Sequence, residues 1–98
     1  MALHHVQDLA GFFSNASRKI ESSGALLIAD LYEEDGSFHH NDPYFKGHNG
    51  FNIDNLSTMM LTHGFKVSQV EEYFKVPKTG PNGLNKEYPI FFLTAYKI

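Results

Sequence analysis

The stretch GALLIADLY, residues 24–32, decides how the rest of the chain must be arranged. Its apolar run is continuous up to the acidic Asp30, and it has the length of a single strand. A strand without polar alternation is typical of one that is covered on both faces, as in α/β proteins with parallel strands. We therefore expect residues 25–31 to form a strand of an α/β domain, with Asp30 near its carboxyl end.

Two amphipathic helices flank this strand in the sequence. From His5 to Ile20 the apolar residues recur at intervals of three and four, which predicts a helix, and Gly24 is available for the left-handed position after it. A second helix is expected from an Asn52 cap to Gly64. The polar segment 33–51 lies between strand and second helix, and loops of this length are usually functional.

Two more strands follow the second helix. Residues 65–75 alternate in polarity, with a change of phase near Val70 that predicts a bulge, and the turn-rich segment 77–87 leads to the last strand, EYPIFFLTAYKI (87–98). A helical crossover makes the first two strands parallel, whereas the last strand should return antiparallel and, being apolar on both faces, lie between them. We predict a three-stranded mixed sheet in the order first, third, second, with two main helices.

The composition narrows the class of protein. The 98 residues suit one small domain, 1–98, and the absence of cysteine excludes disulfides, thiolate metal sites and cysteine nucleophiles. A net charge of −3 without a basic stripe argues against nucleic-acid and membrane partners. Since no apolar run approaches the roughly 20 residues of a membrane span, we expect a soluble, cytoplasmic protein.

Taken in order, ALHHVQD, SSGALLIADLYEEDGSFH, HNGFNIDNLSTMMLTHGF and YPIFFLTAYKI resemble the C-terminal half of class I S-adenosylmethionine-dependent methyltransferases. The resemblance implies a Rossmann-like fold, here the end of the fourth strand followed by strands five, six and seven with their helices. It also implies methyl transfer from S-adenosylmethionine to an acceptor that the sequence does not identify.

The family's first half carries a glycine-rich turn that approaches the cofactor closely, and these residues lack one. We therefore expect a fragment that neither binds S-adenosylmethionine nor turns over alone. The alternatives are one half of a split enzyme, completed by a partner chain, and a non-catalytic oligomerising or binding module.

The resemblance places Leu3 and His4 at the cofactor and makes His4, His5 and Asp30 the candidate catalytic residues, one of which could act as a base. A structural alternative is that the two histidines cap the first helix, with Asp8 pairing with His4 at helical spacing. In that alternative Asp30 satisfies backbone donors at the end of its strand.

By the same resemblance the long loop is a lid that faces the substrate; otherwise it is a solvated loop without a role. The residues expected to bind substrate are Tyr32, Phe38, His39, Tyr44 and His48. A metal site built from the loop residues His39, His40, Asp42 and His48 is disfavoured. Adjacent histidines in a strand point to opposite faces, and no HxH or HExxH spacing occurs, so we expect no metal site.

Strand 25–31 should also have a free edge, because the family's fourth strand would normally flank it. Leu26, Leu27 and Ile28 make that strand apolar, and exposed edges of this kind recruit further strands. We expect a homo-oligomer formed through this edge, or a partner chain that supplies the missing half.

Overall fold

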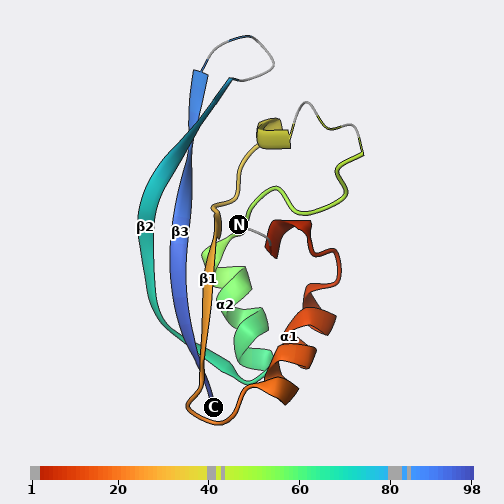
Figure 1. The fold of residues 1–98 in the computed structure, drawn as a ribbon, viewed down its shortest axis with the longest axis vertical. Helices are drawn as coiled ribbons and strands as arrows, with labels where there is room; N and C mark the ends of the chain where they lie inside the picture. The colour runs from red at the N-terminus through yellow and green to blue at the C-terminus, as the bar shows by residue number, and fades with distance from the viewer. Residues whose placement is uncertain (1–2, 40–41, 43, 80–82, 84) are drawn as a thin grey trace.

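The computed structural model describes residues 3–39, 42, 44–79, 83 and 85–98. A three-stranded sheet in the order β1-β3-β2 forms one layer, and two α-helices form the other (Figure 1). The elements are η1 (Leu3–His5), α1 (Leu9–Lys19), β1 (Ala25–Leu31), η2 (Ser37–His39), α2 (Ile53–Thr62), β2 (Phe65–Thr79) and β3 (Asn85–Lys97), where η denotes a short 3-10 helix.

The predicted strand order is confirmed, and β3 is central and antiparallel to both neighbours. The prediction of a mixed sheet was wrong, because β1 and β2 run in the same direction without pairing, so both ladders are antiparallel. In the β1–β3 ladder Ile28 lies opposite Leu93, and Asp30 lies opposite Phe91. The helix between β1 and β2 fixes their common direction, as expected for a crossover connection.

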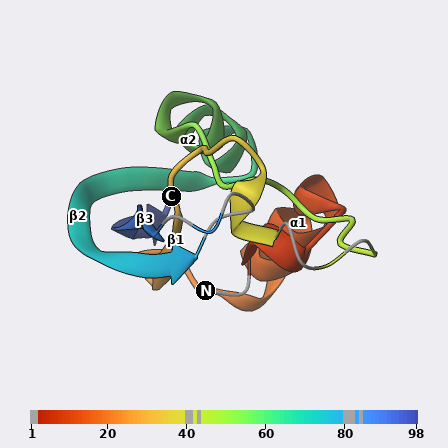
Figure 2. The same ribbon diagram turned by 90° about the horizontal axis from the view of Figure 1, so that it is seen from above.

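The β2–β3 hairpin is longer than the sequence indicated. Residues 77–79 and 85–87, which were expected to belong to the turn, continue the ladder, with Thr79 opposite Asn85. The expected irregularity in β2 is confirmed, and register shifts occur at Val67/Gln69 and again at Glu72/Phe74. Bulges increase the local bend of a strand, and β2 curls around β3 (Figure 2).

The first helix starts later than predicted. Asp8 is the N-cap of α1, and its side chain accepts a hydrogen bond from the Gly11 backbone N–H at 2.9 Å. Residues before this cap form the separate η1 turn, so the predicted helix from His5 was wrong at its start. The left-handed residue after α1 is Ser23 (φ 68°), and it was wrongly assigned to Gly24.

The boundaries of the second helix are confirmed. The Asn52 side chain accepts a hydrogen bond from the Asn55 N–H at 3.1 Å, which is the N-cap arrangement. At the other end Gly64 takes a left-handed conformation with φ 90°, which only glycine adopts without strain.

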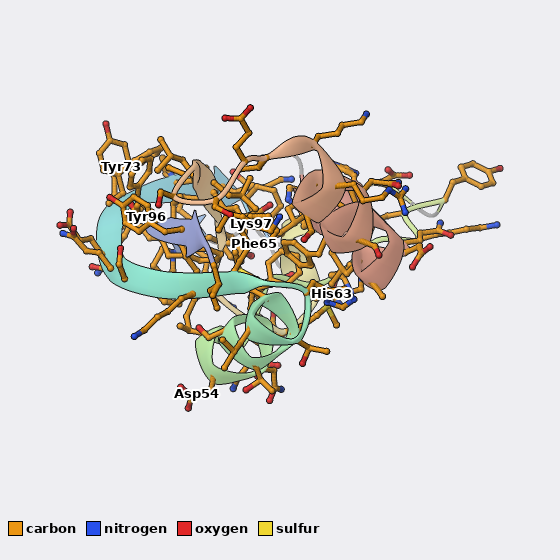
Figure 3. The ribbon with its side chains drawn as sticks, turned by 90° about the horizontal axis from the view of Figure 1, so that it is seen from below. Asp54, His63, Phe65, Tyr73, Tyr96 and Lys97 are labelled. Carbon is orange, nitrogen blue, oxygen red and sulfur yellow. The ribbon has the colours of Figure 1, made fainter. Side chains whose placement is uncertain are left out.

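The main core lies between the helices and one face of the sheet. Its buried side chains come from both helices and all three strands, and Phe13, Met60, Phe65, Phe91 and Leu93 are fully buried. The opposite face, predicted to be equally covered, is half open: Leu31, Tyr88 and Ile90 pack under Phe38 at one end, whereas Leu27 and Tyr96 are exposed. Figure 3 shows Tyr73 and Tyr96 on the side of the sheet away from His63.

Within the described part of the chain, no helix is long and apolar enough to cross a membrane.

Candidate functional site

The polar centre of the molecule is a buried pair formed by His4 and Asp30. The Asp30 side chain is fully buried and that of His4 is 2% exposed. Asp30 Oδ1 lies 2.7 Å from His4 Nδ1, and Asp30 Oδ2 accepts the His4 backbone N–H at 3.0 Å. Asp30 Oδ1 also accepts the Leu31 N–H at 2.7 Å. A carboxylate can only accept, so the His4 ring donates from Nδ1 and its Nε2 stays available.

The expected pairing of Asp8 with His4 was therefore wrong, because Asp8 caps α1 and Asp30 binds the imidazole. The expected structural role of Asp30 is confirmed in part, since it binds the backbone N–H of Leu31 at the end of β1. Its contact with His4 spans 26 residues of sequence, which local spacing could not reveal.

The two ends of the segment 33–51 lie against this pair and the end of β1. The Phe51 N–H donates to Leu31 O and the Glu33 N–H donates to Phe51 O, both at 2.9 Å, beside the end of β1. The His48 N–H donates to His4 O at 2.7 Å. These bonds fix where the loop leaves and rejoins the sheet.

Two glycines allow this close return. A Cβ on Gly47 would overlap the carbonyl oxygen of His4, and a Cβ on Gly50 would overlap that of Tyr32. Gly50 also has a positive φ of 75°. The only sequence signal for these residues is GHNG (47–50), a turn-forming composition that does not by itself predict contact with His4 or Tyr32.

Three histidines meet at this point: His4 and His5 from η1 and His39 from η2. One ring nitrogen of each lies within 4.8 Å of the other two. The ring centroids of His4 and His5 are 4.2 Å apart, and those of His4 and His39 are 5.0 Å apart. His39 is stacked on Phe45, with centroids at 3.8 Å and an interplanar angle of 3°. Sequence separation of more than 30 residues hid this cluster from motif analysis.

The environment of His39 favours its neutral form. Burial lowers the pKa of His39 below its ordinary value of 6.5, and the positive charges of His4, Lys78 and His5 lower it further. Asp42 acts in the opposite direction with a smaller effect. His39 Nδ1 is buried and has no hydrogen-bond partner among the described residues.

A second contact group joins the loop to the hairpin. Phe38 packs edge-on against Tyr88 with centroids 5.1 Å apart, and the Lys78 ammonium lies 4.1 Å from the centre of the Phe38 ring. Lys78 Nζ also donates to the Phe38 carbonyl, and the Ser37 hydroxyl bonds to that of Tyr88. These contacts hold η2, and therefore His39, over the end of the sheet.

Of the other predicted site residues, Phe38 lies at the histidines, with its ring centroid 4.9 Å from that of His39 and 6.4 Å from that of His4, whereas Tyr44 and Tyr32 lie elsewhere. Tyr44 is 84% exposed, and Tyr32 packs against Phe91 with centroids 5.4 Å apart. The His48 ring faces Phe51 at 5.6 Å. His40 lies outside the described residues. The substrate and cofactor roles expected for the site residues, including those for Leu3 and Phe38, stay predictions.

A shallow apolar groove of about 260 Å³ runs beside β1, on the edge that faces away from β3. Its lining comes from the N-terminal segment, α1 and β1: Leu3, Val6, Phe12, Leu26, Leu27, Ile28 and Ala29. Leu27 is 57% exposed there. Among the described residues, no strand pairs with this edge of β1, and only its carboxyl end is occupied, where Leu31 O accepts the Phe51 N–H. The rest of the edge lies next to an apolar surface.

Comparison of the sequence with protein-family models and with curated proteins gave no match.

Proposed function

We propose that this chain forms the acceptor-side half of a class I S-adenosylmethionine-dependent methyltransferase domain. The observation that carries the proposal is the strand arrangement. Two strands of common direction, joined by a helix, enclose a last strand that runs antiparallel between them. This is the arrangement that the resemblance implies for strands five, seven and six. A fold supports many functions, so the residues at its site must carry the chemistry.

The position of the histidine cluster is consistent with that role. In open α/β sheets, ligands bind outside the carboxyl ends of the strands, and Asp30 and His4 lie at the carboxyl end of β1. Asp30 acts here as a positioning residue, because it orients the imidazole of His4. His4 and His5 would face the acceptor, and one of them could take a proton from the attacking hydroxyl or amine.

A chimera tests this proposal. Residues 1–98 are joined to the glycine-rich half of a class I methyltransferase, and S-adenosylmethionine binding is measured by calorimetry. We expect micromolar binding by the chimera and none by this chain alone or by the donor half alone. A chimera that unfolds cooperatively in a thermal scan but does not bind the cofactor would contradict the proposal, as would tight binding by this chain alone.

We also propose that the isolated chain self-associates through β1. The supporting observation is the unpaired edge beside the apolar groove, since such edges pair with other strands. Sedimentation of the wild type should show a dimer or a larger assembly, and Leu27→Lys should give a monomer because it places a charge on that edge. Lys66→Leu, on the other side of the sheet, is the control. A monomeric wild type at high micromolar concentration would exclude self-association.

A further inference from the structure

We propose that His4, His5 and His39 form a binding site for a divalent transition-metal ion, with Zn²⁺ as the ion that fits best. The proposal does not require the methyltransferase fold, because it rests on this chain's own side chains. An imidazole nitrogen that binds the ion cannot at the same time accept a proton, so the two proposals assign different roles to His4 and His5. The metal-site proposal also replaces the expectation of no metal site, which considered only residues of the loop.

The ring nitrogens are close enough together to bind one ion after a small movement of the side chains. One nitrogen of each ring lies within 4.8 Å of the other two. Tetrahedral zinc with Zn–N bonds of about 2.0–2.1 Å places two nitrogens roughly 3.3 Å apart. The rings therefore approach each other by at most about 1.5 Å on binding, which rotation of side chains supplies. His5 is exposed and free to make that movement, whereas His4 is fixed.

Asp30 prepares His4 as a ligand. Metal-binding histidines usually donate their second ring N–H to a carboxylate or a carbonyl, which fixes the tautomer and strengthens the ligand. The 2.7 Å contact between Asp30 Oδ1 and His4 Nδ1 is such an arrangement and leaves Nε2 for the ion. Because Asp30 is itself held by two backbone N–H groups, the ring of His4 has one orientation.

One ring nitrogen of His39 lacks a hydrogen-bond partner in the described part of the chain. Its Nδ1 is buried without a hydrogen bond among the described residues, although buried polar atoms are nearly always paired. Its ring is held by the stack on Phe45. An ion bound at this nitrogen would supply the missing partner.

The three imidazole ligands determine which class of metal ion the site can bind. Three imidazoles without carboxylate or carbonyl ligands suit zinc and its neighbours, and not magnesium or calcium. Three protein ligands leave a fourth position for water or a substrate atom, as in catalytic zinc sites. The Lys78 ammonium, whose charge reaches His39, opposes a bound cation.

Calorimetric titration with Zn²⁺, and an absorption titration with Co²⁺, test the site. The chain is used without an affinity tag and with an acetylated N-terminus, so that neither tag nor amine adds a ligand. We expect one ion per chain and the intense visible absorption of four-coordinate Co²⁺. His39→Gln and His5→Gln should each weaken Zn²⁺ binding more than 10-fold, and Asp30→Asn should weaken it about 10- to 100-fold.

His63→Gln and His48→Gln are the matched controls, because His63 bonds to Met59 O and His48 packs on Phe51. Both should bind Zn²⁺ like the wild type. The proposal is overturned if the wild type binds no Zn²⁺ up to about 0.1 mM, or if His63→Gln loses as much affinity as His39→Gln. It is also overturned if His5→Gln and His39→Gln, shown to be folded by circular dichroism, bind unchanged. Because Asp30 is buried, Asp30→Asn is informative only if it folds. If it does not fold, His5→Gln and His39→Gln decide the test.

Discussion

The carboxyl end of β1 and the distal part of the β2–β3 hairpin differ in how deeply their charged and aromatic side chains are buried. At the end of β1, Asp30 and His4 are buried and satisfy each other. Along the distal hairpin, residues 71–79 and 85–87, Tyr73 is 66% and Phe74 51% exposed, and Lys86 pairs with Asp35 in solvent. We therefore expect substitutions of buried residues at the end of β1 to disturb the fold, and substitutions of exposed aromatic residues on the distal hairpin, such as Phe74, to leave it intact.

The largest effect is expected from truncating aromatic side chains in the two regions. Phe91 lies opposite Asp30 and is fully buried, so Phe91→Ala should lower the free energy of unfolding by about 3–5 kcal/mol. Phe74→Ala, on the distal hairpin, should lower it by less than about 1 kcal/mol. Urea denaturation measures both. Equal losses would show that the hairpin is packed against something in solution.

Replacing Asp30, at the end of β1, and Asp35, which pairs with Lys86 of the distal hairpin, should change the stability of the protein by very different amounts. Asp30→Ala leaves the N–H groups of His4 and Leu31 and the His4 ring without an acceptor, which should cost about 3–5 kcal/mol. Asp35→Ala removes an exposed partner of Lys86 and should leave the urea midpoint at pH 7 unchanged. A small effect at Asp30 would mean that water replaces its bonds.

Two glycines with similar backbone angles give a stricter comparison. Gly50 (φ 75°) and Gly83 (φ 78°) are both left-handed, so an alanine at either should cost about 1–2 kcal/mol from the backbone alone. At Gly50 the new Cβ would overlap the carbonyl of Tyr32, whereas at Gly83 none of the described residues has an atom within 4 Å of it. Thermal unfolding should therefore show a clearly larger loss of stability for Gly50→Ala than for Gly83→Ala. Equal losses would mean that the backbone at Gly50 does not lie in close contact with Tyr32 in solution.

The smallest effect concerns pH. Burial lowers the pKa of His39 in the folded state below its unfolded value of about 6.5. The unfolded chain then binds more protons, so this residue's contribution to stability is present above pH 6.5 and decreases as the pH falls below it. Urea denaturation of metal-free protein at pH 7.5 and 5.5 should show a smaller pH dependence for His39→Gln than for the wild type. His63→Gln serves as the control, and a dependence unaffected by His39→Gln would contradict the assignment.

The sequence predicted the parts of the fold that depend on local patterns. The apolar run 25–31, the Asn52 cap, Gly64 and the phase change in β2 each act within a few residues, and each prediction is confirmed. The start of α1 was predicted too early. An aspartate can either pair with a nearby histidine or cap a helix, and the sequence around Asp8 does not distinguish the two roles. The open face of the sheet was missed because apolar residues on both faces of β3 resemble those of a strand that is covered twice.

The site was predicted only in part. His4, His5, Asp30 and His39 were each singled out, but their assembly depends on contacts between residues 26 or more apart. Those contacts need Gly47 and Gly50 to bring the loop back, and Phe38, Tyr88 and Lys78 to hold η2 in place. No local spacing encodes such an arrangement, so no metal-binding motif within the loop indicates it.

The most direct test of the three-histidine site is a long-range ¹H–¹⁵N spectrum of the histidine rings, recorded without metal and with one equivalent of Zn²⁺. We predict that metal-free His4 carries its proton on Nδ1, the nitrogen that faces Asp30. We also predict that Zn²⁺ shifts one nitrogen each of His4, His5 and His39 and leaves His63 unchanged. A neutral His4 ring protonated on Nε2, or zinc-induced shifts that miss His39 and involve His63, would contradict the account.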